Sequence, residues 1–209
     1  MLAKVCGLTR QGDIHVCAEL GVDFAGFIFH SGSSRFLAPE QVRRLQTETM
    51  TRVGVFVRHS WREVSEIMDY AGLHLAQLHG GQDREFCLRL GVDRVIKVLW
   101  PESYSNREEM LRDLEVFSPC CRYFLLDSGH CGGGHGRPVN TDMLPKVSEM
   151  GAFGCSWFLA GGLGPENIGK ALKRNPDGVD LNSGVETEPG IKSRDLLTQT
   201  MEEIRGESI

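Results

Sequence analysis

Short apolar runs alternate with longer amphipathic stretches along the chain. The runs are apolar at nearly every position, instead of at every second one, which is typical of parallel strands covered on both faces. We therefore expect eight buried strands, at residues 2–5, 24–29, 53–57, 73–78, 95–99, 123–126, 157–160 and 178–181.

The stretches between these runs have the pattern of helices. Ser60 and Glu63, and likewise Ser105 and Glu108, have the S-x-x-E spacing of a capping box, which satisfies backbone N–H groups at a helix start. Apolar residues follow each motif three and four positions apart, as one helix face requires: Val64, Ile67, Met68 and Ala71 after the first, and Met110, Leu111, Leu114 and Phe117 after the second.

Eight strand-helix units in 209 residues leave about 26 residues for each unit. A closed α/β barrel of the (β/α)8 TIM type, with eight parallel strands, fits this order better than an open doubly wound sheet. We expect residues 1–209 to form one compact barrel domain with few insertions. Such a domain can be stable alone, so we also expect a monomer.

The composition narrows the functional classes. The 23 basic and 28 acidic residues give a net charge of -5, which offers no basic field for a nucleic acid. No run approaches the roughly 20 apolar residues that span a bilayer, and the first ten residues lack the apolar core of a signal peptide. We therefore expect a cytoplasmic protein with neither a nucleic-acid nor a membrane partner.

The seven cysteines contain no C-x-x-C pair, so neither a disulfide framework nor a zinc site is expected. His130, Cys131 and His135 lie in the glycine-rich sequence GHCGGGHG, which offers no rigid element to hold a coordination geometry. We expect no metal there. We expect this loop to fold over a substrate as a lid.

A barrel places its active site at the carboxyl ends of the strands. Cys6 follows the first strand, and Lys4 shares its face because side chains alternate along a strand. A nearby cation lowers the pKa of a thiol, so this pair favours a thiolate that can act as a base. The alternative is a small buried residue without a role.

Other polar residues also follow predicted strands. Asp127 directly follows the apolar run 123–126, which indicates either function or a cap for the next loop. Gln77 and His79 share a face of the fourth strand, where they are either wall residues or substrate contacts. Arg35, in the loop after the second strand, either binds a carboxylate bidentately or lies in solvent.

Two glycine-rich loops follow the last two strands, where barrels commonly bind phosphate. Glycines let backbone N–H groups approach an anion closely, and a following helix adds free amides. One Gly-Gly pair alone is more often a plain turn. Two such loops together predict a phosphate site formed by Gly161, Gly162, Leu163, Asn182, Ser183 and Gly184.

Seven segments resemble the phosphoribosylanthranilate isomerase family in order and spacing, along nearly the whole chain: KVCGLTR, GFIFHSGSSR, VGVFV, AQLHG, LLDSGHCGGGHG, LAGGLGPENI and GVDLNSGVETEPGIK. The segment AGGL occurs in many phosphate-binding barrels. The specific combination is CGLT at the first strand with DLNSGVE at the eighth.

The resemblance implies an isomerase of tryptophan biosynthesis that rearranges a phosphosugar aminoaldose to an aminoketose, an Amadori rearrangement that needs no cofactor. It implies that Asp127 protonates the furanose ring oxygen and that Cys6 removes the proton from C2′. Asp127 then needs a pKa above its ordinary value of about 3.9. It also implies Arg35 on the anthranilate carboxylate, Asp180 near the anthranilate amine, and the glycine loops on the phosphate.

The chain departs from the family pattern in three places. The loop of Arg35 reads S-S-R where the family often has S-P-R, which loosens the presentation of the arginine. Asn182 stands where serine is common. His135 and Arg137 stand where many relatives have a hydroxyl and a lysine or glutamine, so contacts from this loop are the least defined by the resemblance.

Two other functions are compatible with such a barrel. The analogous isomerase of histidine biosynthesis performs the same rearrangement on a larger substrate with two phosphates, and it typically has aspartate where this chain has Cys6. A barrel without catalytic activity would keep the phosphate loops but tolerate loss of Cys6 or Asp127. The presence of both residues and of one recognisable phosphate site favours the anthranilate isomerase.

Overall fold

The structure is a computed structural model that describes residues 1–127 and 147–206. Eight parallel strands pair in sequence order and close into a barrel. Its strands are β1 (Leu2–Val5), β2 (Phe24–Ile28), β3 (Thr51–Phe56), β4 (Leu75–Leu78), β5 (Val95–Leu99), β6 (Tyr123–Asp127), β7 (Ser156–Ala160) and β8 (Gly178–Leu181). The α/β barrel predicted from the apolar runs is therefore confirmed.

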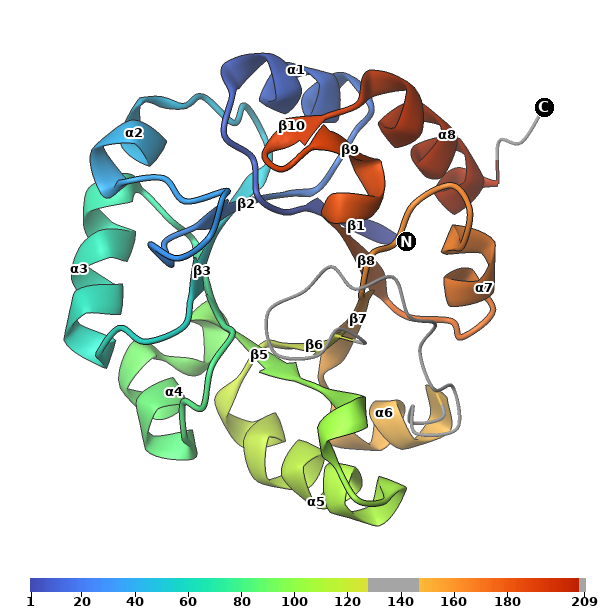
Figure 1. Ribbon diagram of the computed structural model, residues 1–209. Helices are drawn as coiled ribbons and strands as arrows, with labels where there is room; N and C mark the ends of the chain where they lie inside the picture. The colour runs from blue at the N-terminus through green and yellow to red at the C-terminus, as the bar shows by residue number, and fades with distance from the viewer. Residues whose placement is uncertain (128–146, 207–209) are drawn as a thin grey trace.

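Helices surround the barrel on its outer side (Figure 1). They are α1 (Gln11–Glu19), α2 (Pro39–Arg44), α3 (Trp61–Ala71), α4 (Arg84–Leu90), α5 (Arg107–Phe117), α6 (Val147–Phe153), α7 (Ile168–Leu172) and α8 (Arg194–Arg205). Short 3-10 turns are η1 (Val92–Arg94), η2 (Pro101–Ser103), η3 (Ser118–Cys120) and η4 (Ser183–Val185). A small antiparallel hairpin of β9 (Glu186–Glu188) and β10 (Ile191–Lys192) lies between β8 and α8.

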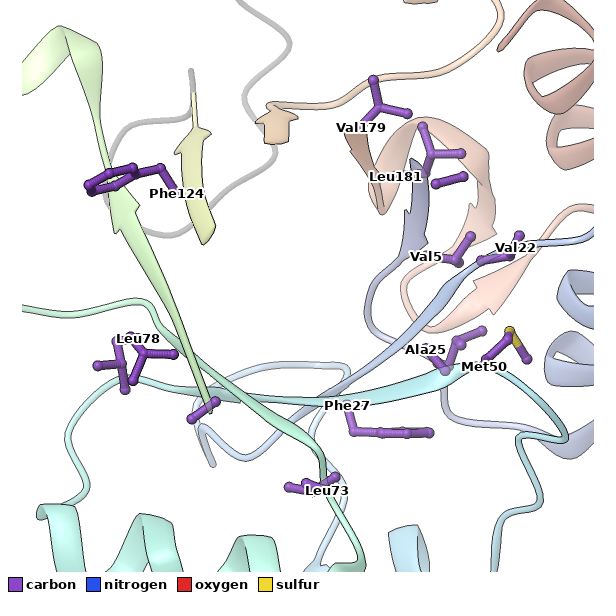
Figure 2. Close-up of a cluster of buried hydrophobic side chains, with 14 of the residues drawn as sticks. Val5, Val22, Ala25, Phe27, Met50, Leu73, Leu78, Phe124, Val179 and Leu181 are labelled. Carbon is purple, nitrogen blue, oxygen red and sulfur yellow. The ribbon is translucent and has the colours of Figure 1, made fainter. Parts of the chain in front are cut away.

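Side chains of each strand point alternately into the barrel and outward to the helices, which gives two buried layers. The outer layer packs strands against helices, and Figure 2 shows part of it, including Val5, Phe27 and Leu181. A smaller inner cluster fills the barrel itself. Because both strand faces are covered, the strands are apolar at nearly every position.

The barrel interior is plugged by three aromatic rings near its amino-terminal end. Phe24, Tyr123 and Phe158 pack edge to face, with ring centroids 5.4–6.0 Å apart. Gly178 makes room for them, because a Cβ at this position would lie 2.4 Å from Cε1 of Phe158. This end of the barrel interior is therefore a packed core.

The first and last strands close the barrel. Leu2 to Val5 pair in register with Gly178 to Leu181, and Lys4 stands opposite Asp180. Their side chains form an ion pair inside the barrel, with 2.8 Å between Nζ of Lys4 and Oδ1 of Asp180. Lys4 is fully buried, and its pKa is raised because Asp180 and Cys6 together outweigh the effect of burial. This seam between β1 and β8 is therefore held by a side-chain ion pair as well as by backbone hydrogen bonds.

The predicted strands all exist, and 2–5, 95–99 and 178–181 have the predicted ends, while the others differ by one or two residues at one end or, for β3, at both ends. The capping box at Ser60 and Glu63 is confirmed, because each side chain accepts from the backbone N–H of the other. The second predicted box is wrong. Asn106 caps α5 by accepting from the N–H of Glu109, and Glu109 reaches back to the N–H of Ser105.

Residues 1–127 and 147–206 lack two further features. None of the helices there combines the length and the apolar character that crossing a bilayer requires. No three histidine, cysteine or acidic side chains in those ranges are arranged to hold a metal ion.

Candidate active site

A cavity of about 340 Å³ opens at the carboxyl ends of the strands. Most of the residues singled out in the sequence line this cavity, although they follow strands that are far apart in the chain. These residues are Cys6, Arg35, Gln77, His79, Asp127, Gly161, Gly162, Asp180, Asn182 and Ser183. Leu163 and Gly184, also predicted for the phosphate site, do not line this cavity.

Cys6 extends β1 by one residue, since its N–H donates to the carbonyl of Leu181 on β8 over 2.8 Å. Its side chain is 4% exposed and shares the interior face with Lys4. Gly26 on β2 leaves room for both, because a Cβ there would lie 3.1 Å from Sγ of Cys6 and 3.2 Å from Nζ of Lys4. The expected pairing of Cys6 with Lys4 is therefore present.

The protonation state expected for Cys6 is wrong. Burial raises the pKa of the thiol above its ordinary value, and Asp180 adds to this shift, while Lys4 and Lys192 oppose it. Burial outweighs the two cations because a thiolate loses its hydration inside the barrel. The resting site therefore holds a protonated thiol, with two ammonium groups placed to favour its ionised form.

Asp127 ends β6 and is 7% exposed. Its Oδ2 lies 3.8 Å from Nε2 of His79, which is too far for a hydrogen bond. Burial lowers the pKa of His79 to about 4, so the imidazole is neutral near neutral pH. The ring of Trp100 packs edge-on against His79 at 5.3 Å. Asp127 thus faces a neutral group in a poorly hydrated part of the cavity.

Gln77 and His79 lie side by side on the cavity wall. Nε2 of Gln77 is 3.4 Å from Nδ1 of His79, a distance that suits a donor facing an unprotonated ring nitrogen. Oε1 of Gln77 is buried and has no hydrogen-bond partner among the described residues. A buried acceptor without a partner indicates a place for a donor from a ligand.

The two glycine loops meet at the mouth of the barrel. Gly161 and Gly162 have φ angles of 122° and 65°, which favour glycine. A Cβ on Gly164 would lie 2.3 Å from the carbonyl oxygen of Gly184, and a Cβ on Gly184 would lie 2.2 Å from that of Leu163. The backbones of the two loops therefore approach each other closely at Leu163, Gly164 and Gly184, where only glycine fits at the last two positions.

Asn167 was not singled out in the sequence, although it fixes the first of these loops. Its amide nitrogen donates to the carbonyl of Gly162 over 3.0 Å, and its Oδ1 accepts from the N–H of Gly164 over 2.9 Å. The signal available was an asparagine three residues after a glycine loop, which is too common to be specific.

Arg35 has a partner that the sequence did not indicate. Its guanidinium forms a bidentate pair with Glu186 of β9, with Nη2 2.6 Å from Oε2 and Nε 2.9 Å from Oε1. Lys192 of β10 donates to the same carboxylate over 2.7 Å. The hairpin after β8 thus reaches across to the loop after β2.

The predicted lid, residues 129–136, with His130, Cys131, His135 and the adjacent Arg137, lies outside the described residues.

The barrel and its site define an enzyme of the (β/α)8 class that acts at the carboxyl ends of its strands. The family model described as N-(5'phosphoribosyl)anthranilate (PRA) isomerase matches residues 3–203. The chain belongs to this family, as its sequence segments implied.

Individual relatives agree with this assignment. The N-(5'-phosphoribosyl)anthranilate isomerase of Maridesulfovibrio salexigens is 47% identical over 198 residues, 94% of this chain and 95% of the relative. That of Desulfovibrio desulfuricans is 44% identical and covers 96% of this chain and 94% of the relative. The crystal structure of phosphoribosyl anthranilate isomerase from Thermotoga maritima superposes with a TM-score of 0.84 at 31% identity, covering 99% of this chain and 100% of that one.

One further solved structure of phosphoribosyl anthranilate isomerase is a complex with reduced 1-(o-carboxyphenylamino)-1-deoxyribulose 5-phosphate. It superposes with a TM-score of 0.81 at 29% identity, over 99% of this chain and all of that one.

Proposed function

We propose that the chain isomerises N-(5'-phosphoribosyl)anthranilate to 1-(2-carboxyphenylamino)-1-deoxyribulose 5-phosphate in tryptophan biosynthesis. The observation that carries this proposal is one cavity, lined by Cys6, Asp127 and two glycine loops, in a chain of this family. Substrate and product have the same oxidation level, so the reaction requires proton transfers and no redox cofactor.

Two groups divide the proton transfers in this proposal. Asp127 protonates the furanose ring oxygen, which opens the ring to an iminium, and Cys6 then removes the proton from C2′. The resulting enolamine tautomerises to the ketone. The placement of Cys6 on β1 and Asp127 on β6, on opposite sides of one cavity, supports this division of roles. It requires Asp127 to hold a proton at the start.

The remaining residues bind the substrate in this proposal. Gly161, Gly162 and Ser183 offer backbone N–H groups to the phosphate, helped by the amino end of η4. Leu163, Asn182 and Gly184 complete the two loops. Arg35 receives the anthranilate carboxylate and Asp180 lies near the anthranilate amine. Gln77 and His79 contact the opened sugar, for which the unpartnered Oε1 of Gln77 provides an acceptor.

The assay that tests the proposal follows anthranilate fluorescence as phosphoribosylanthranilate is consumed. We expect turnover by the wild type and a loss of about 100- to 10,000-fold in kcat for Cys6→Ala and for Asp127→Asn, which is the usual contribution of general acid-base groups. Undiminished turnover by either variant contradicts its assigned role. A wild type active only on the two-phosphate substrate of histidine biosynthesis favours that isomerase, and inactivity on both favours a barrel that only binds.

We also propose a single-domain, cytoplasmic monomer. In support of a monomer, the barrel closes on itself and buries its hydrophobic core within one chain. Light scattering on the purified protein tests this, and a mass twice the 23.2 kDa of the chain contradicts it.

A further inference from the structure

The hairpin of β9 and β10 carries two buried charged residues beside the candidate active site. The side chains of Glu186 and Lys192 are 4% and 1% exposed, and they form an ion pair of 2.7 Å. Glu186 also binds Arg35, whose side chain is 19% exposed and lines the cavity. Burying three charges is costly unless they serve a purpose or satisfy one another. Only Arg35 reaches the cavity.

The geometry of the pair leaves one edge of the Arg35 guanidinium available. Glu186 accepts from Nε and from one N–H of Nη2, which is the side-on arrangement. A guanidinium has five N–H groups, so the two on Nη1 and the second on Nη2 remain. Within the described residues, Nη1 makes no hydrogen bond. These N–H groups form the end-on edge, which matches a second carboxylate bidentately.

Charge decides whether that edge attracts an anion. An Arg35–Glu186 pair alone would be neutral. Lys192 donates to Oε1 of Glu186, to the carbonyl oxygen of Asn182 at 3.3 Å and to Oδ1 of Asn182 at 3.0 Å. Three acceptors match the three hydrogens of an ammonium, so Lys192 is charged although burial lowers its pKa. The cluster of Arg35, Glu186 and Lys192 therefore has one net positive charge.

We propose that Glu186 and Lys192 make Arg35 a receptor for one carboxylate and so determine selectivity for the carboxylated aromatic amine of the substrate. Glu186 fixes the orientation of the guanidinium, and Lys192 restores the positive charge that Glu186 would otherwise cancel. Neither contacts the substrate, so both are positioning residues. This inference rests on the proposed function and extends it. It also explains how Arg35 is held without the proline common in the family, since Ser33 and Glu186 bind it instead.

The test compares two substrates, phosphoribosylanthranilate and N-(5-phosphoribosyl)aniline, which lacks the carboxylate. The readout is selectivity, defined as the ratio of kcat/KM for the first to kcat/KM for the second. An effect on Cys6 or on folding lowers both rates and cancels in this ratio. The variants are Glu186→Asp, which keeps the charge but shortens the reach to Arg35, and Lys192→Met, which keeps an unbranched side chain but removes the charge.

We expect each variant to lower selectivity by about tenfold, and Arg35→Ala to lower it further, because charge-assisted bidentate contacts are lost. In an Arg35→Ala background, Glu186→Asp should have no further effect on the ratio. The matched control is Glu188→Gln, on the exposed end of the same hairpin, which should leave the ratio unchanged.

Unchanged selectivity in Glu186→Asp and Lys192→Met overturns the inference, and so does an equal effect of Glu186→Asp with and without Arg35. If Glu186→Asp fails to fold, as circular dichroism would show, Lys192→Met still decides, because it leaves the Arg35–Glu186 pair intact. Failure of the proposed function looks different, since the wild type would then turn over neither substrate.

Discussion

Cys6 shows how burial and charge compete at a single side chain. The thiol is almost fully enclosed, which raises its pKa, while the ammonium groups of Lys4 and Lys192 act in the opposite direction. A thiolate in such surroundings is a strong base, but only a small fraction of the thiol is ionised at neutral pH. The reaction rate should therefore depend on how readily the proton leaves this thiol.

The first prediction concerns the pH dependence of kcat/KM. Cys6 acts only when deprotonated, and its pKa lies above the ordinary 9.0, so activity is lost as pH falls through that raised pKa. Asp127 must keep its proton in the same reaction, so we expect the effect of Cys6 to appear in the Asp127→Asn variant, whose residual kcat/KM should rise up to and beyond pH 9, by about tenfold per pH unit where the thiol limits the rate. Steady-state kinetics between pH 6 and pH 10 provide the measurement, in steps of about half a unit. A plateau reached by pH 7 would contradict it.

A second prediction identifies the cation that helps Cys6. In the same Asp127→Asn background, Lys192→Met removes a positive charge that lowers the pKa of the thiol, so the rise of kcat/KM should move to higher pH. Lys170 is an exposed lysine on α7, and Lys170→Met is the matched control that should leave the profile in place. Identical profiles for all three proteins would mean that Lys192 does not act on Cys6.

Helix starts give a third prediction, because two similar sequence motifs have different roles. Ser60 caps α3 and Asn106 caps α5, whereas the hydroxyl of Ser105 takes no part in the cap. Ser60→Ala and Asn106→Ala should each lower the free energy of unfolding by about 1 kcal/mol. Ser105→Ala should change it by less than about 0.5 kcal/mol. Urea denaturation followed by circular dichroism measures this, and a larger loss for Ser105→Ala than for Asn106→Ala would reverse the assignment.

The strands were predictable because their apolar runs arise from burial on both faces, a property of each segment by itself. The cap of α5 was harder to predict, since Ser105 and Asn106 are adjacent and both are good capping residues. The hairpin of β9 and β10 was not predicted at all. Its role depends on a contact between Glu186 and Arg35, which are 151 positions apart, and no local pattern encodes that distance.

Some features of the candidate site could likewise be predicted from the sequence, and others could not. Placing Cys6, Asp127 and the glycine loops together needed only the rule that barrel sites form at strand ends, and the cavity brings these residues together. The protonation state of Cys6 could not be predicted, because it depends on how completely the folded barrel removes water from the thiol. The resemblance supplied the roles of acid and base, which stay predictions.

The two ends of the barrel differ in what they contribute, which gives a fourth prediction. Phe158 is fully buried in the aromatic plug, away from the polar groups of the cavity. Phe158→Ala should lower the free energy of unfolding by about 3–5 kcal/mol. Under conditions where the variant is folded, its KM should stay within about twofold of the wild type, because the opposite end of a barrel mainly provides stability. Urea denaturation and steady-state kinetics measure the two quantities.

Val116→Ala, at a position 47% exposed on α5, is the control for this fourth prediction and should change neither quantity. A large rise in KM for Phe158→Ala, with little loss of stability, would show that the plug shapes the catalytic end directly.

The seam between β1 and β8 has a consequence for how the protein is made. Asp180 follows Lys4 by 176 positions, so at about 5–20 residues per second a ribosome needs roughly 9–35 s between them. During that interval one edge of β1 has no neighbouring strand, and unpaired edges invite association with other chains. The nascent chain thus carries Cys6 beside an open strand edge for most of its synthesis, until β8 pairs with β1.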